Sequence, residues 1–397
     1  MHVSPEMHAT NRISDIEVLR AVAVLFVIFQ HLRNLFPWQI PALNELQGVA
    51  GGMFGVDLFF AVSGFVIARD LIPRMLAAGS WPEKGRVMGA FWLRRIWRLW
   101  PAAWLWLALI LLAVVFLNES GAFGTLAANL DATVAGVFNF ANIRFAQTFM
   151  RSEYGASFVY WSLSLEEQFY LLFPLLILLF RKHLAWLLLA VALLQIVTPR
   201  QHPYLMMFRT DALALGILLA IWSQRASWQL AAKYLSLLGR RACQLIFLIS
   251  VAGMAVLSTP DSPSRYAVGI IAILSAILVF IAAHDRDLLL RPGRPKSLLM
   301  WIGERSYALY LIHVPAFFLA RELFYRMDPA QPFSVGLAAA YGGSALLILL
   351  VVTELNFRLV EMPLRRYGAG LSQRLLSSNH SSDGNPIILP PETRHPG

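Results

Sequence analysis

The sequence predicts an all-α integral membrane protein with about ten transmembrane helices and both termini in the cytoplasm. Of its 397 residues, 58% are hydrophobic and 14% are charged, and the mean hydropathy is +0.60. A soluble domain of this size cannot hide so much apolar surface in one core. Apolar stretches of about 20 residues, the length that crosses a bilayer as a helix, recur along the chain. They lack the two-residue alternation of a transmembrane barrel.

Ten such stretches divide the chain. The predicted helices cover residues 15–36, 50–69, 98–117, 160–180, 184–198, 206–222, 242–258, 266–283, 299–320 and 336–358. The predicted transmembrane domain covers 15–367. Residues 1–14 are expected to form a cytoplasmic tail. Residues 368–397, whose last part is rich in Ser, Asn, Pro and His, are expected to form a disordered cytoplasmic tail.

The basic residues orient the predicted helices. An even number of crossings places both termini on one side, and 23 of the 33 lysines and arginines fall in the segments on that side. The positive-inside rule makes it the cytoplasmic side. The net charge of +10 is thereby explained without nucleic acid as a partner.

The lone Cys243 excludes an internal disulfide and a thiolate metal site, and no metal is expected. The first apolar stretch is long and no small-residue cleavage site follows it, so it is expected to remain as the first transmembrane helix.

Ionisable side chains from four predicted helices fall at one depth, in the outer third of the membrane. They are His31, Asp57, the neighbouring Glu166 and Glu167, and His313. Each costs free energy when it faces lipid, so these groups are expected to meet in an interior cavity or to pair with one another. A functional cluster and simple interhelical pairing both remain open.

The chemistry of these groups suggests roles. His31 can take a proton from an alcohol, and a carboxylate at its other ring nitrogen, Asp57 or Glu166, can fix its tautomer. Ser162, Glu166 and Tyr170 share one i, i+4 row, which favours Glu166 over Glu167 as the inward-facing acid.

Arginines gather at the opposite, cytoplasmic end. Arg20 precedes His31 by eleven residues on nearly the same helix face, about 16 Å along the axis. Arg95 and Arg98 begin the third helix, and Arg305 lies toward the same end. Such arginines can bind anionic lipid, or the phosphates of an elongated donor such as coenzyme A.

Other polar residues are predicted to contact an acceptor or to support the structure. Arg209 and Asp211 are expected to form a salt bridge with each other or to contact a sugar. The remaining members of this group are Ser63, Glu167, Tyr170, Tyr310 and His313.

Taken in order, these motifs resemble the membrane-bound acyltransferase-3 family of bacterial polysaccharide and lipopolysaccharide O-acetyltransferases. The matching segments are Arg20 with His31, GVDLFFAVSGF at 55–65, RRIWRLWP at 94–101, YWSLSLEEQFY at 160–170, RTDALALG at 209–216, SYALYLIH at 306–313 and VEMP at 360–363.

The resemblance implies that residues 15–367 form an acyltransferase domain with ten helices in a bacterial inner membrane. It further implies acetyl-CoA as co-substrate from the cytoplasm, and an acceptor hydroxyl on a carbohydrate or lipid-linked glycan at the outer face. It also implies that His31 is catalytic with Arg20 as its motif partner. By the same likeness Arg95 and Arg98 recognise the donor, and Glu166 occupies the family's acidic position. Some members carry a fused esterase-like domain, which is not expected here.

Three functions stay open at this point. An O-acyltransferase would use His31 as general base or as a transient acyl carrier. A proton-coupled transporter or flippase of a glycan precursor would use the same intramembrane groups as a relay. An inactive relative would only bind polysaccharide precursors.

Overall fold

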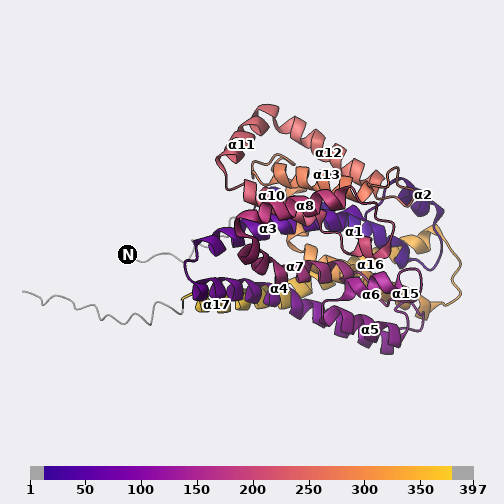
Figure 1. Ribbon diagram of the computed structural model, residues 1–397. Helices are drawn as coiled ribbons and strands as arrows, with labels where there is room; N and C mark the ends of the chain where they lie inside the picture. The colour runs from indigo at the N-terminus through magenta and orange to yellow at the C-terminus, as the bar shows by residue number, and fades with distance from the viewer. Residues whose placement is uncertain (1–12, 378–397) are drawn as a thin grey trace, which may run out of the picture.

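A computed structural model describes residues 13–377 of the chain. Helices hold 79% of those residues and no strand occurs among them, which confirms the all-α class. Most of the long helices run roughly along one axis (Figure 1). The expected tails at 1–12 and 378–397 lie outside the described residues. The predicted disorder from residue 368 is wrong up to Ser377, because a helix continues to that residue.

Four helices form the centre of the bundle: α1 (Ser14–His31), α3 (Phe54–Ala77), α10 (Asp211–Trp222) and α13 (Ala267–Ala282). Most of their apolar residues are buried, as expected for core helices. The most extensive helix contact joins α3 and α10, where glycines allow close approach. A β-carbon at Gly64 would collide with the carbonyl of Leu213, and one at Gly216 with the carbonyl of Ala61.

A second group comprises α4 (Trp81–Phe116), α7 (Tyr160–Phe180), α15 (Ser306–Met327) and α17 (Met362–Ser377). Helix α4 begins 17 residues before the predicted start, because Ser80 and Glu83 form a capping box and Pro82 occupies the first turn. This early part of α4 packs along α17, and Arg94 donates to the hydroxyl of Ser372.

The predicted helix over 299–320 is wrong in its beginning, because the chain breaks at Arg305 into α14 (Arg294–Glu304) and α15. Helix α14 instead packs beside α1. Gly303 permits this approach, since a β-carbon there would collide with the carbonyl of Glu17.

The remaining helices are shorter or lie at the periphery. They are α2 (Pro41–Val49), α5 (Leu126–Val137), α6 (Ala141–Thr148), α8 (Leu184–Ile196), α9 (Pro203–Met207), α11 (Ala226–Leu238), α12 (Arg240–Leu257) and α16 (Val335–Asn356). Single 3₁₀ turns at Leu32–Leu35 and Arg181–His183, and a π-turn at Phe357–Glu361, connect neighbouring helices.

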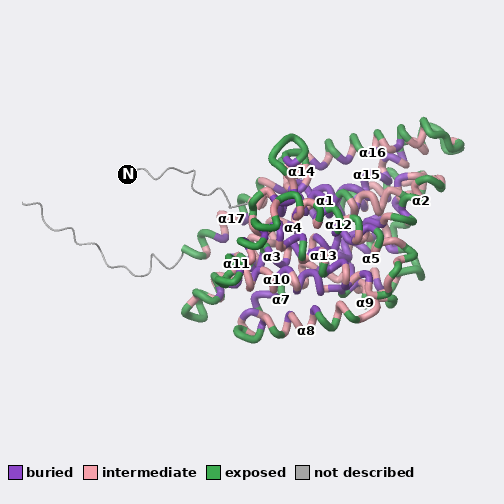
Figure 2. Tube along the Cα trace, turned by 90° about the horizontal axis from the view of Figure 1, so that it is seen from above, coloured by how far each residue is buried: buried purple, intermediate pink, exposed green. Residues whose placement is uncertain are grey.

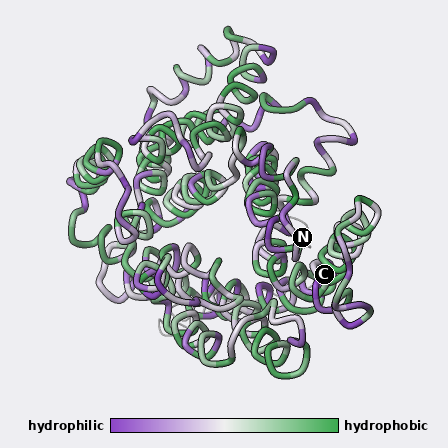
Figure 3. The backbone as a smooth tube through the Cα atoms, turned by 90° about the vertical axis from the view of Figure 1, so that its right-hand side faces the viewer, coloured by the Kyte–Doolittle hydropathy of each residue, from purple (hydrophilic) through white to green (hydrophobic). Residues whose placement is uncertain are grey.

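The helices carry the apolar surface of a membrane protein. Within residues 13–377, six helices are long and apolar enough to cross a membrane, or seven if the bent pair α2 and α3 counts as one span. The predicted count of ten spans is therefore not confirmed. Helices α8 and α16 lie at the edges of the bundle and are largely half-buried or exposed (Figure 2). Hydrophobic residues make up much of the helical segments (Figure 3).

Both described ends of the chain lie at one end of the bundle, consistent with an even number of crossings (Figure 1). The beginning of α1 is fixed there by the ammonium of Lys296, which contacts the carboxylates of Asp15 at 2.6 Å and Asp287 at 2.5 Å. The hydrogen bond from Lys296 holds the pKa of Asp287, in the loop before α14, below its ordinary value.

We predict that Gly216→Ala destabilises the protein in detergent by roughly 1–3 kcal/mol, because the added methyl group forces α3 and α10 apart. The measurement is the unfolding midpoint in a denaturing-detergent titration. Gly343→Ala on α16 is the control, since nothing lies within 4 Å of its added β-carbon. Equal midpoints for the two variants would contradict this account of the α3–α10 contact.

Candidate active site

A cavity of about 420 Å³ opens between α1, α3, α4, α7 and α15. Its basic lining residues are Arg20, Arg69, Arg95, Arg98 and Arg365. Three of the four predicted donor-binding residues, Arg20, Arg95 and Arg98, thus meet in one place. The clustering of like charges implies an anionic ligand or compensating acids.

The fourth predicted member, Arg305, does not line this cavity. Its guanidinium binds Glu354 at 2.5 Å and lies over the rings of Trp301 and Phe357. Arg305 sits at the break between α14 and α15, so this ion pair attaches the break to α16. A donor-binding role for Arg305 is not supported by this position.

The polar row predicted on α7 faces the cavity. Ser162, Glu166 and Tyr170 all line it, and the Tyr170 hydroxyl donates to the carboxylate of Glu166. Ser63 of α3 lines it as well. Glu167 points elsewhere and accepts a hydrogen bond from the indole of Trp100. The preference for Glu166 as the inward acid is therefore consistent with the geometry.

His31 pairs with a second imidazole, not with a carboxylate. Its Nδ1 lies 3.0 Å from Nε2 of His313, which is fully buried on α15. The expected contact with Asp57 or Glu166 is not present among the described side-chain hydrogen bonds and ion pairs. Helices α1 and α15 pack together at this level, which brings the two histidines into contact, whereas α3 directs Asp57 to a different neighbour.

Backbone carbonyls define the tautomer of this pair. Nδ1 of His313 lies 2.8 Å from the carbonyl of Tyr310 and 3.2 Å from that of Leu309. Carbonyls only accept, so Nδ1 of His313 carries the proton and its Nε2 presents a lone pair. Nδ1 of His31 must then donate to that lone pair. The arrangement leaves Nε2 of His31 unprotonated and able to act as a base or a nucleophile.

The histidine pair adjoins the cavity without lining it. Tyr310 lines the cavity, and its ring centroid lies 5.8 Å from that of His313. The Tyr310 hydroxyl contacts the hydroxyl of Ser162 at 2.5 Å and the carbonyl of Val159 at 3.0 Å. The wall formed by Tyr310 and Ser162 thus lies toward the histidines, while the arginines line another part of the cavity.

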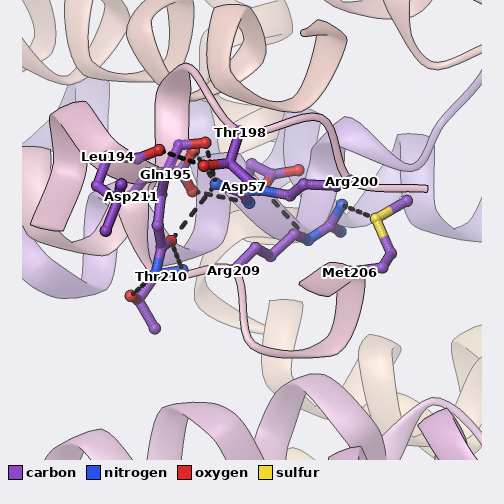
Figure 4. Close-up of polar contacts among 9 residues, drawn as sticks. All are labelled: Asp57, Leu194, Gln195, Thr198, Arg200, Met206, Arg209, Thr210 and Asp211. Atoms are coloured by element: carbon purple, nitrogen blue, oxygen red, sulfur yellow. Dashed lines mark hydrogen bonds and ion pairs between the residues drawn. The ribbon is translucent and has the colours of Figure 1, made fainter. Parts of the chain in front are cut away.

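The predicted salt bridge between Arg209 and Asp211 is wrong in its partners. Arg209 Nε lies 3.3 Å from Asp57 Oδ1, and Arg200 binds Asp211 at 2.6 Å (Figure 4). The chain turns between α9 and α10, which directs Arg209 to α3 and Asp211 to the segment between α8 and α9. The guanidinium of Arg209 also lies 5.1 Å from the ring centroid of Trp161. All four charged side chains are almost fully buried.

Several cavity-side residues, Arg69 among them, escaped the sequence analysis. Arg365 and Tyr307 line the cavity, and buried Glu361 interacts electrostatically with Arg98, Arg20 and Arg365. The sequence signal that could have identified Glu361 and Arg365 is the segment VEMPLRR at 360–366, where the π-turn joins α17. Glu361 balances part of the positive charge of the arginine cluster. Within residues 13–377, no group of three or more His, Cys, Asp or Glu side chains could hold a metal ion.

The chain matches the family described as "Acyltransferase domain" over residues 13–353. Peptidoglycan O-acetyltransferase OatA of Listeria monocytogenes serovar 1/2a is 28% identical over 385 residues, which cover 90% of this chain and 56% of that protein. Putative peptidoglycan O-acetyltransferase YrhL of Bacillus subtilis is 28% identical, with 90% and 55% covered. O-acetyltransferase OatA of Staphylococcus aureus strain NCTC 8325 is also 28% identical, with 91% and 59% covered.

The chain thus spans just over half the length of these curated relatives. No solved structure matches it.

We predict that Asp57→Ala and Arg209→Ala each lower the free energy of unfolding by about 3–5 kcal/mol, because each leaves a partner charge buried without its counter-ion. The double variant should cost clearly less than the sum of the two. The measurement is a double-mutant cycle of unfolding midpoints in detergent. Arg358→Ala, which removes an exposed partner of Glu354, should cost less than about 1 kcal/mol. Additive effects at Asp57 and Arg209 would show that the pair is not coupled.

Proposed function

The chain belongs to the acyltransferase domain family, and we propose that it is a multi-pass membrane O-acyltransferase. It transfers an acyl group, expected to be acetyl, from acyl-CoA to a hydroxyl of a carbohydrate acceptor. The names of its relatives support O-acetyl transfer to a glycan. The observation that carries the proposal is a cavity with arginines in one part and, in another, the wall that adjoins the His31–His313 pair.

The donor is held by charge at the cytoplasmic end. Coenzyme A carries phosphates far from its thioester, and Arg20, Arg95 and Arg98 offer forked donors suited to phosphate oxygens. The helical separation of about 16 Å between Arg20 and His31 suits a long, thin molecule bound at one end and reacting at the other. The excess of basic residues in the loops at this end supports a cytoplasmic orientation.

His31 acts through Nε2, the nitrogen that the hydrogen-bonded pair leaves unprotonated. In direct transfer, Nε2 removes the proton of the acceptor hydroxyl while the oxygen attacks the thioester carbonyl. The carbon–sulfur bond then breaks, and the imidazolium returns the proton to the departing thiolate. In the covalent alternative, Nε2 itself attacks the thioester, releases the thiol and passes the acyl group to the hydroxyl.

Other cavity residues position the reacting groups. Glu166 and Tyr170, joined by a hydrogen bond, present acceptor and donor atoms beside the thioester path. Tyr310 and Ser162 form the wall between that path and His313. We assign Asp57 a structural part, since it holds Arg209 against α3.

Release of free CoA separates this function from its rivals. Purified protein in lipid nanodiscs should release CoA from acetyl-CoA when an acceptor glycan is present. A transporter, a flippase or an inactive relative would release none.

We predict that His31→Gln lowers transfer by at least about 100-fold without lowering the unfolding midpoint, because the base or nucleophile is lost. His313→Gln should retain more activity than His313→Phe, since an amide oxygen can still accept from Nδ1 of His31 and a phenyl ring cannot. The measurement is CoA release together with unfolding midpoints. Equal losses in the two His313 variants would contradict the tautomer assignment.

We predict that Arg98→Ala raises KM for acetyl-CoA by about tenfold or more, because a charge-assisted contact with phosphate is lost. The KM for the acceptor should stay unchanged. Steady-state kinetics provide the measurement, and Arg151→Ala in the exposed segment before α7 is the control. An increase confined to the acceptor KM would reverse the placement of the two substrates.

A further inference from the structure

The histidine pair has a second cavity on its other side. This cavity, of about 370 Å³, is formed by residues 121–124, Phe145, residues 148–150 and 152–156, Phe158 and Phe318. It shares no lining residue with the arginine-lined cavity. We propose that this second cavity is the acceptor subsite and binds a neutral sugar ring of the glycan, an inference that rests on the proposed acyltransferase function.

Two chain segments place the His31–His313 pair between the two cavities. On α15, Tyr310 lines the first cavity and Phe318 lines the second, eight residues or about 12 Å further along the helix. His313 lies between them on the same helix. Before and within α7, Phe158 lines the second cavity and Ser162 lines the first.

Phe158 connects the second cavity to the reacting nitrogen. Its ring packs edge-on against His31, with the ring centroids 5.3 Å apart. The side chain of His31 remains half-buried, in contrast with the fully buried His313. Only the ring of Phe158 therefore separates His31 from a ligand that contacts the cavity side of that ring.

The lining of the second cavity matches a sugar better than a phosphate-bearing donor. Its walls include the rings of Phe123, Phe145, Phe149 and Tyr154, and its polar groups are hydroxyls, a carboxylate and peptide groups. Aromatic faces pack against the C–H faces of a pyranose, while hydroxyls and peptide groups bond its hydroxyls. None of the lining side chains is basic, in contrast with the five arginines of the first cavity.

The second cavity is held open by its own framework. The Glu153 carboxylate accepts from the backbone and hydroxyl of Thr125, and the Asn129 amide links Phe123, Thr125 and Ala156. Gly155 adopts a left-handed conformation with φ +104°, and a β-carbon there would lie 2.9 Å from the Asn129 side chain. A preformed wall needs little ordering when a ligand binds.

The experiment compares three variants of the full chain in nanodiscs. Phe149→Ala removes an aromatic wall, Ser152→Trp fills the cavity, and Phe138→Ala removes an exposed ring that does not line it. Both substituted wall positions are exposed, so folding should be unaffected. Kinetics use acetyl-CoA with soluble peptidoglycan fragments, the glycan named for the relatives.

The expected result is that Phe149→Ala raises the KM for the glycan fragment about tenfold and that Ser152→Trp abolishes glycan-dependent transfer. The KM for acetyl-CoA and its slow hydrolysis without acceptor should not change, and Phe138→Ala should behave as the unaltered chain.

A raised KM for acetyl-CoA would assign the cavity to the donor. An altered preference between acetyl-CoA and octanoyl-CoA would assign it to the acyl chain. Either outcome, or an unchanged glycan KM in both variants, overturns the proposal.

Direct binding separates this inference from the proposed function. Saturation-transfer NMR detects contact of the glycan fragment with the protein without any turnover. Binding that Ser152→Trp abolishes supports the cavity even if the unaltered chain releases no CoA, in which case the acyltransferase proposal alone fails. Binding that persists in Ser152→Trp, or its absence from the unaltered chain, overturns the subsite.

Discussion

The position of the proton on His31 depends on two peptide carbonyls of another helix. The carbonyls of Leu309 and Tyr310 fix the proton on Nδ1 of His313, and His313 in turn fixes the proton on Nδ1 of His31. A carboxylate in the place of His313 would also orient His31, but it would bring a charge into the membrane interior, where charge is costly. An imidazole held by backbone atoms orients its neighbour without adding a charge.

Helix α1 keeps Arg20 and His31 at a constant separation. Its beginning is held by Lys296 through Asp15, and Gly303 lets α14 lie against the Glu17 carbonyl. Near its other end Gly52 approaches the Phe26 carbonyl closely, again with no space for a side chain. The helix is therefore packed along its length, and the distance between its arginine and its histidine is set by helical geometry alone.

Patterns that depend on one helix could be predicted from the sequence, and patterns that depend on two could not. The row of Ser162, Glu166 and Tyr170 follows from helical spacing, and all three line the cavity. The partners of Asp57 and Arg209 depend on which helices are neighbours, which spacing along the chain does not reveal. The same holds for the His31–His313 contact.

The break at Arg305 and the second cavity were not predicted from the sequence, for two other reasons. The short segment Gly303–Ser306 interrupts the apolar stretch and signals a turn, which the predicted helix over 299–320 ignored. The ion pair of Arg305 with Glu354 is a tertiary contact that the sequence does not reveal. The phenylalanines of the second cavity lie in and around irregular segments, where apolar residues predict packing more readily than binding.

The position of His31 and His313 between two cavities has a bioenergetic consequence. An enzyme open to both faces of an energised membrane must not become a pore, because leaking ions would discharge the gradient that powers the cell. Two hydrogen-bonded imidazole rings with no net charge form a poor path for hydrated ions. On the proposed function, the same pair that carries out the chemistry also insulates the membrane during each turnover.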